Sequence, residues 1–304
     1  MDLSIILISW NVADLLVNCL RSIFAHPPDG VFEVWVVDNA SHDNSVQIIQ
    51  EQFPQVKLIL NEKNVGFAAA NNQALQASNG RFALLLNPDT VVSEETLQKL
   101  VGFLDENPQV GAAGSLYQNP DGSLQPSCYP FPTVAREFWR LLHMDKLYAF
   151  GVYNMQRWSK ETPREVDALQ GASLLLRRAA LEETGLLDTS YFMYTEEIDL
   201  CYRLHLKGWT LYWVPQSRIV HLGGQSTRQD ALKMFLHLYG SKVQFFRKHY
   251  GERSARSYKR VLKFTSGIRL ALTSIGSAVR PQNRRYYQQL RRNYENLIAS
   301  LPTM

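Results

Sequence analysis

Several features that define common protein classes are missing from this chain of 304 residues. It contains no run of about 18 uncharged apolar residues, so we expect no membrane-spanning helix. No basic segment followed by apolar and small residues stands at its start, so we expect no signal sequence. The three cysteines, Cys19, Cys128 and Cys201, are scattered and lack C-x-x-C spacing. They predict reduced thiols in a cytoplasmic protein rather than disulfides or a zinc site.

The common nucleotide-binding loops are missing as well. A dehydrogenase of the α/β class carries G-x-G-x-x-G after its first strand, where this chain has Ser9-Trp10-Asn11. A sugar nucleotidyltransferase would have a loop rich in glycine and arginine at the same place, and a P-loop is also absent. These absences argue against the three classes of nucleotide enzyme.

Charge is distributed unevenly along the chain. Residues 230–304 contain 15 Lys/Arg and 3 Asp/Glu, a net of +12, whereas residues 1–229 carry a net of −8. A basic tail on an acidic body predicts an anionic partner for the tail, which is a membrane surface, nucleic acid or the body itself. The tail contains no recognisable nucleic-acid module, so we expect no nucleic-acid partner.

Apolar runs alternate with segments of helical spacing in the first third of the chain. Strands are expected at Leu3 to Ile8, Val31 to Val37, Val56 to Leu60 and Phe82 to Leu86, with helices at Ala13 to Phe24, Ser45 to Phe53 and Gly66 to Ala77. This alternation predicts an α/β fold with a Rossmann-like, mostly parallel sheet flanked by helices. Ligands of such sheets bind beyond the carboxyl ends of the strands. We therefore expect Asn11, Asp38, Asn64 and Asp89 to converge on one crevice.

The remaining chain is divided by changes in composition. Residues 117–165 are rich in proline and aromatic residues and predict a long functional loop with short helices. The α/β pattern resumes at Val166 to Leu176, and a strand at Trp209 to Val214 leads towards His221. We expect a domain of residues 1–229, comprising a nucleotide-binding half (1–116), an acceptor or lid region (117–165) and a catalytic and acceptor half (166–229). Residues 230–304 are expected to form a basic helical extension.

One helix of this extension has two interpretations. Apolar residues recur at steps of three or four, with basic residues around them: Phe264, Ile268, Leu272, Ile275 and Val279, with Lys259, Arg260, Lys263 and Arg269. The pattern fits a basic amphipathic helix lying on a membrane. It fits equally well a helix packed on the protein with its charges in solvent.

Two acidic positions follow predicted strands. Asp89, in Asn87-Pro88-Asp89, is placed to hold a divalent cation on a diphosphate, although the tripeptide is also ordinary turn chemistry. Asp38 is placed to accept a hydrogen bond from a base imide or a ribose hydroxyl, and the polar residues after it, Ser41 or Asp43, to cap a helix.

A third acidic cluster opens a later helix. Glu196, Glu197 and Asp199 stand where the helix dipole favours acids, and Asp199 can pair with Arg203 four residues on. One acid left over would suit a general base. A lone histidine is most often structural, but the glycines Gly223 and Gly224 after His221 would let it face phosphate oxygens or a metal ion.

Together these segments resemble the family 2 inverting glycosyltransferases with the GT-A fold, and most closely their bacterial rhamnosyltransferase-like branch. The matching segments span roughly residues 3 to 227 in family order: SIILISWN, VVDNASHDNS, NEKNVGFAAANNQAL, LLLNPDT, QGASLLLRRAAL, GLLDTSYFMYTEEIDLCYRL and HLGGQST. The resemblance implies an enzyme that moves a sugar from a nucleotide-diphospho-sugar, with dTDP-rhamnose as the best guess and a UDP-sugar as the other candidate. It implies inversion at the anomeric carbon and dependence on Mg²⁺ or Mn²⁺.

The resemblance also assigns roles to residues. Asp89 and His221 would hold the metal ion, and Glu197 would be the base, with Glu196 and Asp199 as alternates. The donor nucleotide would be surrounded by Ser9, Trp10, Asn11, Asp38, Asn39, Asn64, Gly66, Phe67, Asn71, Asn87 and Pro88. The acceptor would meet Trp158, Gly171, Ala172 and Tyr194. That acceptor is expected to be a glycan or a polyprenyl-diphosphate-linked glycan at the inner face of the cytoplasmic membrane, where the basic extension would bind anionic lipid.

Two departures from the family pattern support an alternative. Asn87 replaces the first acid of the family's D-x-D motif, and Glu197 stands where the family usually has aspartate. A degenerate member of the fold, serving as a membrane-bound scaffold without turnover, is therefore the second hypothesis.

Overall fold

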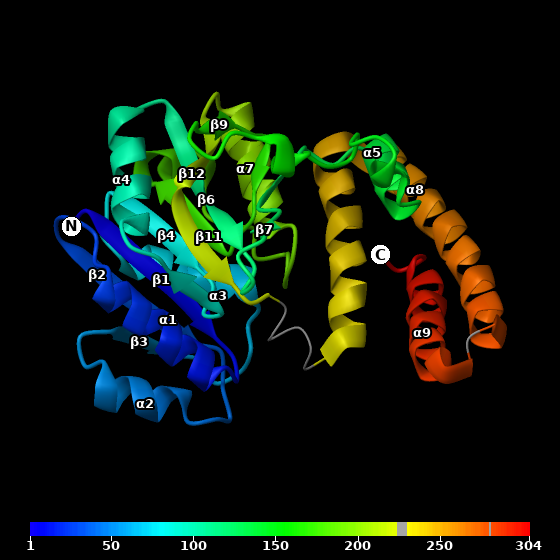
Figure 1. Cartoon of the computed structure of the whole chain (residues 1–304), viewed down its shortest axis with the longest axis horizontal. Helices are drawn as coiled ribbons and strands as arrows, with labels where there is room; N and C mark the ends of the chain where they lie inside the picture. Colours follow the sequence, from blue (N-terminus) through cyan, green and yellow to red (C-terminus); the bar gives the residue numbers. More distant parts are fainter. Residues whose placement is uncertain (224–229, 280) are drawn as a thin grey trace. The chain divides into compact units, whose positions relative to one another are not determined.

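The computed structural model of the protein describes residues 1–223, 230–279 and 281–304. Gly224 and Ser226 of the HLGGQST match lie outside the described residues. The chain forms two compact units (Figure 1). Unit 1 comprises Met1–Phe131, Asn154–Phe192 and Glu196–Gln229, and unit 2 comprises Pro132–Tyr153, Met193–Thr195 and Asp230–Met304.

The first third of unit 1 alternates strand and helix as predicted. The elements are β1 (Leu3–Ser9), α1 (Ala13–Ala25), β2 (Phe32–Asp38), α2 (Ser45–Gln52), β3 (Lys57–Leu60), α3 (Phe67–Ala77) and β4 (Phe82–Leu86). The strands β3, β2, β1 and β4 are neighbours in this order and run parallel. Their carboxyl ends therefore share one edge of the sheet.

The second part of unit 1 extends this sheet with strands of both directions. It contains β5 (Thr90–Val92), α4 (Thr96–Glu106), β6 (Val110–Gln118), β7 (Leu124–Gln125), β9 (Arg164–Glu165), β11 (Ser173–Arg177), α6 (Arg178–Thr184), α7 (Glu196–Leu206) and β12 (Thr210–His221). Over the described residues the order is β3-β2-β1-β4-β11-β6-β12-β5, with β7 on β6 and β9 on β12. Because β11 runs antiparallel to both β4 and β6, the sheet is mixed. Over the described residues four of its strand pairs are parallel and five antiparallel, but the parallel pairs hold most of the paired residues, which confirms the mostly parallel character predicted.

A short second sheet and a turn of helix complete unit 1. β8 (Cys128–Tyr129) pairs antiparallel with β10 (Ala168–Leu169), and η2 covers Met155–Arg157. The segment Val166 to Leu176, where the α/β pattern was expected to resume, forms the two strands β10 and β11 with a turn at Gly171-Ala172 between them. β12 continues through Pro215 to His221, with a register shift between Val214 and Arg218 that accommodates the proline.

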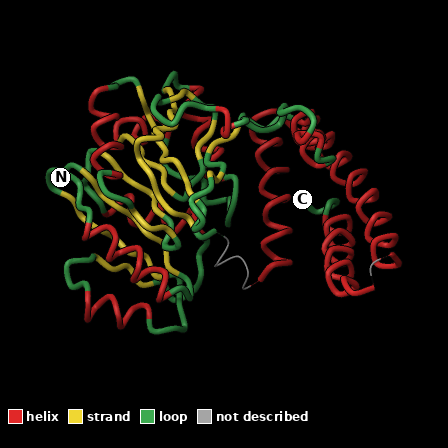
Figure 2. Tube along the Cα trace, viewed as in Figure 1, coloured by secondary structure: helices red, strands yellow, loops and turns green. Residues whose placement is uncertain are grey.

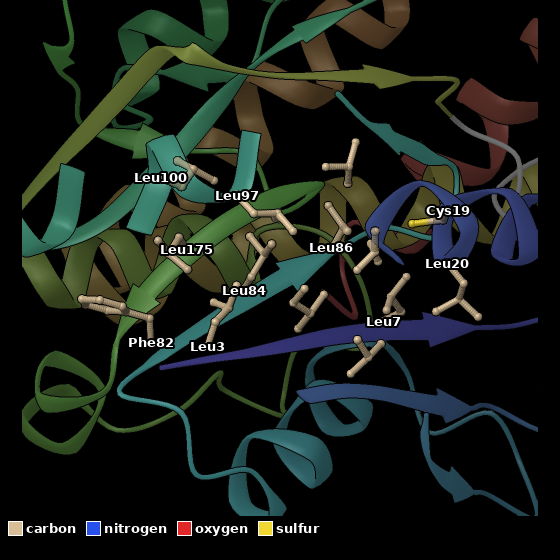
Figure 3. Packing of buried hydrophobic residues seen from close by; sticks show 14 of the residues in the cluster. Leu3, Leu7, Cys19, Leu20, Phe82, Leu84, Leu86, Leu97, Leu100 and Leu175 are labelled. Carbon is tan, nitrogen blue, oxygen red and sulfur yellow. The ribbon is translucent and has the colours of Figure 1, made fainter. Parts of the chain in front are cut away.

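The main core lies on one face of this sheet. Leu3, Ile5 and Leu7 of β1 alternate along the strand and pack with apolar residues of α1, α2 and α4. Figure 3 shows this packing around Leu7, Leu84, Leu86 and Leu100. In Figure 2 the strands of the sheet are yellow and the helices are red. Each fully buried leucine contributes about 1.5–3 kcal/mol. This core fixes the positions of the strands whose carboxyl ends carry the candidate site.

Unit 2 is helical. It consists of α5 (Val134–Leu141), η1 (Met144–Lys146), α8 (Ala231–Val279), η4 (Pro281–Asn283) and α9 (Arg284–Ser300). The helix predicted from Val261 is thus the last part of α8, which is interrupted at Gly251 by a residue with φ 81° and ψ 170°. Its core joins Phe246 and Tyr258 of α8 to Leu297 of α9, with Val134 and Leu141 of α5 packed against them.

Candidate active site

The ends of β1 and β2 carry the first predicted donor residues. Ser9 and Asp38 are partners in the parallel register, and the backbone N–H of Asn39 donates to the carbonyl of Ser9 at 2.8 Å. Asp38 Oδ2 accepts from the backbone of Ser41 at 2.9 Å, but Asp38 Oδ1 is buried and has no hydrogen-bond partner among the described residues. The same holds for Ser9 Oγ and, on α3, for Asn71 Oδ1. Buried acceptors without protein partners mark a place where a ligand supplies the donors.

The loops after these strands are held in unusual backbone conformations. Asn11 and Ala40 have φ of 54° and 61°, a region that residues with a side chain rarely adopt. Asn11 is fixed there, since its N–H donates to Ser41 Oγ at 3.0 Å and its Oδ1 accepts from the N–H of His42 at 2.7 Å. Trp10, beside it, is half-buried. Such strain gathers at functional sites, where it fixes a geometry in advance.

The predicted helix cap is more elaborate than the sequence indicates. Asn44 occupies the N-cap position of α2 and makes no side-chain cap. Asp43 instead accepts from the first N–H of two helices, Ser45 of α2 at 3.1 Å and Ala13 of α1 at 3.0 Å. Burial opposes the charge of Asp43, but the hydroxyl of Ser45 and these two N–H donors outweigh it and lower the pKa of Asp43. Asp43 thus ties together the loops that flank Asp38.

The start of α3 lies close to the segment before α7. Gly66 has φ 87°, and a Cβ there would lie 2.5 Å from the carbonyl oxygen of Phe192, so only glycine fits without a shift. Phe67 N–H donates to that oxygen at 2.8 Å, and Gly66 is held further by Asn39 Nδ2 and Asn64 Oδ1. This contact connects the start of α3, which carries residues predicted to bind the donor nucleotide, with the segment that leads into α7.

The Asn87-Pro88-Asp89 turn faces β11 and β12. Asn87 N–H donates to the carbonyl of Ala172 at 3.0 Å, Thr90 closes the turn onto the carbonyl of Asn87, and Pro88 is buried. Asp89 is 8% exposed, and its Oδ1 lies 3.4 Å from Nε2 of His221, which ends β12. One carboxylate and one imidazole fit a divalent cation that takes its other ligands from substrate phosphates and water, as Mg²⁺ and Mn²⁺ do. Among the described residues no group of three or more acidic, histidine or cysteine side chains forms a complete metal cage.

The three acids of α7 have different surroundings. Asp199 is fully buried and binds Arg203 Nε at 2.8 Å, which confirms the predicted pair. Arg203 in turn donates to the carbonyls of Thr184, Gly185 and Leu186. Asp199 is therefore part of the packing of α7 against the loop after α6.

Glu196 and Glu197 remain as candidates for the base. Glu196 is 4% exposed, and its Oε2 has no hydrogen-bond partner among the described residues. Burial, and secondly the negative charge of Glu197, raise its pKa well above the ordinary range. Glu197 is only half-buried, and its Cβ lies 3.7 Å from where a Cβ on Gly171 would stand. Because Phe67 lies a similar 3.8 Å from the same point, Gly171 lies next to both Phe67 of the donor side and Glu197.

The predicted acceptor residues are not all gathered there. The side chain of Ala172 is buried with Tyr117 and Ile219. Its carbonyl oxygen accepts the hydrogen bond from Asn87 N–H. Trp158 packs edge-on against Trp213 at 5.4 Å. Trp213 precedes His221 by eight positions on β12, roughly 25 Å along the strand. Tyr194 belongs to unit 2, and it and Thr195 have φ of 69° and 72° directly before α7.

Sequence reasoning missed a polar residue beside His221. Gln125 of β7 places its Oε1 2.6 Å from His221 Nδ1. β7 is two residues long and lies in the segment expected to be a loop. Only the turn signal Asn119-Pro120-Asp121-Gly122 before it could have indicated a hairpin.

The described helices include none with both the length and the apolar character needed to cross a bilayer. Among solved structures, the fold is similar to a mannosyltransferase from Pyrobaculum calidifontis in complex with GDP-Man and Mn²⁺ (TM-score 0.60, 18% identity, 98% of this chain and 85% of that chain). It is also similar to residues 1–349 of S. aureus TarS in complex with UDP (TM-score 0.53, 16% identity, 100% and 92%).

Comparison of sequences points to the same group. An N-acetylglucosaminyl-diphospho-decaprenol L-rhamnosyltransferase of Mycobacterium tuberculosis is 28% identical over 275 residues, covering 83% of this chain and 86% of that protein. A rhamnosyltransferase of Escherichia coli (strain K12) is 25% identical over 181 residues, covering 56% and 66%. Glycosyl transferase family 2 matches residues 4–183. With its mixed sheet, its acids at the strand ends and this match over more than half its length, the chain belongs to glycosyl transferase family 2 and is a glycosyltransferase.

Proposed function

We propose that this glycosyltransferase moves rhamnose from a nucleotide-diphospho-sugar to a hydroxyl of a lipid-linked glycan, with inversion at the anomeric carbon. The observation that carries the proposal is the approach of Asp89 and His221 to 3.4 Å at the strand edge that also holds Asp38. The rhamnosyltransferases of M. tuberculosis and E. coli support the choice of sugar, and the name of the first supports a diphospho-polyprenol acceptor.

The nucleotide would lie over the ends of β1 and β2. Thymine and uracil each carry one imide N–H, and Asp38 Oδ1 is a buried acceptor with no partner among the described residues. The orphan oxygens of Ser9 and Asn71 supply further acceptors for donor hydroxyls. A dTDP- or UDP-sugar therefore suits these residues.

The diphosphate would lie beside Asp89 and His221. A bound Mg²⁺ or Mn²⁺ supplies charge neutralisation for the leaving nucleoside diphosphate. Asp89 contributes a hard oxygen ligand and His221 a nitrogen ligand. Asn87, next to them, is neutral, which leaves the site with one acidic ligand from this turn.

Glu197 would act as the general base. It removes the proton from the acceptor hydroxyl while that oxygen attacks the anomeric carbon from the face opposite the diphosphate, and the bond to the diphosphate breaks. Attack on the opposite face inverts the configuration. Gly171, which lies next to both Glu197 and Phe67, would border the acceptor, and Trp158 is a further candidate for contact with a longer acceptor.

The acceptor's lipid suggests where the enzyme works. Four of the five predicted apolar residues of α8 are more than half exposed: Phe264, Leu272, Ile275 and Val279. Lys263 and Arg260 are exposed near them, whereas Leu262 and Thr265 point into unit 2. Exposed apolar and basic side chains on one helix fit the surface of an anionic membrane. We extend the proposal to peripheral binding of unit 2 at the cytoplasmic face of the membrane, with unit 1 providing the transferase domain.

The donor site is tested by thermal shift with UDP- and dTDP-sugars, with and without Mn²⁺, on the wild type and on Asp89→Ala. We expect stabilisation by one nucleotide that requires the metal ion and is lost in the variant. Equal shifts without metal, or in Asp89→Ala, would contradict the metal site.

Membrane binding is tested by flotation with phosphatidylglycerol vesicles. The double variant Phe264→Ser/Ile275→Ser should float several-fold less than the wild type. Val31→Ser, which changes a residue 60% exposed in unit 1, is the matched control. Equal flotation of all three proteins would rule out this surface of α8.

A further inference from the structure

The β6–β7 hairpin contains a line of polar side chains whose hydrogen bonds have a defined direction. Asp121 Oδ1 accepts from Ser123 Oγ at 2.6 Å, so the hydroxyl proton of Ser123 is used there. The Ser123 oxygen then accepts from Asn119 Nδ2 at 2.9 Å. The carboxylate at the start of the line is an acceptor only, and it therefore orients every amide that follows.

The direction continues from the turn to His221. Because Asn119 Nδ2 faces Ser123, its Oδ1 faces Gln125 and accepts from Gln125 Nε2 at 3.1 Å. Gln125 Oε1 then points to His221 Nδ1 at 2.6 Å. A carbonyl oxygen can only accept, so Nδ1 of His221 must carry a proton. In the neutral ring the lone pair is then on Nε2, the nitrogen 3.4 Å from Asp89 Oδ1.

We infer that Gln125 is a positioning residue that holds His221 in its Nδ1–H form and turns Nε2, as an electron-pair donor, towards the metal ion beside Asp89. This inference rests on the proposed metal-dependent function. In this form the Nε2 lone pair and the Asp89 carboxylate are two electron-pair donors 3.4 Å apart, an arrangement that a divalent cation bound by both would stabilise. Partners that fix the tautomer of a ligating histidine typically change metal affinity by about 10–100-fold.

A second contact fixes the plane of the same ring. The Tyr117 ring meets the His221 ring at 5.5 Å and 66°. Tyr117 is itself held, because its hydroxyl donates to the carbonyl of Gln170 at 2.7 Å and accepts from the N–H of Ser173 at 2.7 Å. Tyr117 restricts the tilt of the imidazole, and Gln125 determines which nitrogen carries the proton.

The test compares three variants with the wild type. Gln125→Met removes the acceptor at nearly constant shape, and Gln125→Glu keeps an acceptor at the same place. Gln118→Met is the matched control, since Gln118 lies on the same hairpin and bonds the carbonyl of Gly122. The His221 tautomer is read from ¹⁵N NMR of histidine-labelled protein, with His221→Gln assigning the signal. Mn²⁺ affinity is read by electron paramagnetic resonance in the presence of UDP or dTDP.

We expect the Nδ1–H form in the wild type, in Gln118→Met and in Gln125→Glu, and its loss in Gln125→Met together with Mn²⁺ binding about 10–100-fold weaker. An Nε2–H form in the wild type, or unchanged Mn²⁺ affinity in Gln125→Met, would overturn the inference while leaving the proposed function intact. Absence of Mn²⁺ binding by the wild type would overturn both. A purely structural role would lower the melting temperature of Gln125→Met and leave tautomer and affinity unchanged, which also overturns the inference.

Discussion

Two buried glutamates, one in each unit, show opposite solutions to the same problem. In unit 2, Glu137 of α5 contacts Lys242 Nζ at 2.7 Å, Arg140 at 3.1 Å and the hydroxyl of Tyr258 at 3.3 Å. In unit 1, Glu196 of α7 is equally buried, but the charge next to it is the negative one of Glu197. The carboxylate of Glu137 is surrounded by hydrogen-bond donors, whereas that of Glu196 lies beside a group of the same charge.

The pKa values of the two groups move apart accordingly. Burial alone would raise the pKa of Glu137, but the charges of Lys242 and Arg140 outweigh it and leave the pKa lowered. Burial raises the pKa of Glu196, and Glu197 raises it further. A buried acid whose partners are complete holds structure together, whereas a buried acid beside a second acid is typical of sites that handle protons. The comparison therefore indicates a structural role for Glu137 and a place in the candidate active site for Glu196, from their surroundings alone.

The sharpest test separates the two neighbouring acids of α7. Glu197→Gln should lower the rate of sugar transfer about 10²–10⁴-fold, because the amide cannot take a proton from the acceptor. Glu196→Gln replaces a carboxyl whose pKa is raised well above its ordinary range by burial and by the charge of Glu197, and it should retain most of the activity. Steady-state transfer rates with saturating donor measure both. The reverse order of effects would make Glu196 the base.

Next in size is the loss of a partner in unit 2. Glu137→Ala leaves Lys242, which is 12% exposed, without its carboxylate, and should lower the free energy of unfolding by about 3–5 kcal/mol. Urea denaturation measures the change. The control is Glu137→Leu/Lys242→Met, which removes both charges and should recover much of the loss. If Glu137→Ala unfolds like the wild type, the contrast with Glu196 has no energetic basis.

The smallest effect is a pH dependence of opposite sign in the two units. The raised pKa of Glu196 contributes stability that is fully present below the unfolded value of 4.5 and is lost as the pH rises through the folded value. The lowered pKa of Glu137 contributes stability that is present above 4.5 and is lost as the pH falls through its folded value. Glu196→Gln should thus melt higher than the wild type at pH 8 and close to it at pH 4. A constant difference across this range would mean that folding does not raise the pKa of Glu196.

Local patterns predicted the first part of the fold well. The strands at Leu3–Ser9 and Phe82–Leu86 and the helix at Phe67–Ala77 lie within a residue or so of their predicted limits, because period and apolar runs are local properties. The direction of β11 is not local. Its run Ser173–Arg177 would suit either orientation, and the partners that make it antiparallel, β4 and β6, lie some 60–90 residues earlier.

The site was predictable where residues follow strands and unpredictable where a distant hairpin reaches it. Asp38 and Asp89 were expected at the strand edge, and both lie there. Gln125 was not expected, because nothing in its neighbours indicates that β7 lies against His221, 96 residues later. The sequence also did not predict that α5 belongs to unit 2, since its amphipathic pattern does not indicate which unit it packs in.

The pairing of Glu137 with Lys242 has a consequence for the order of synthesis. The two residues are 105 positions apart, so α5 leaves the ribosome long before its partner on α8. At about 5–20 residues per second, the carboxylate has only Arg140 of its own helix as a cation for roughly 5–20 seconds before Lys242 is made. During this interval the residues of unit 1 that follow α5 emerge and can pack with those made before it, while Val134 and Leu141 have no core to join. A nascent chain of this enzyme therefore carries the uncovered apolar residues of α5 until its last helices are made.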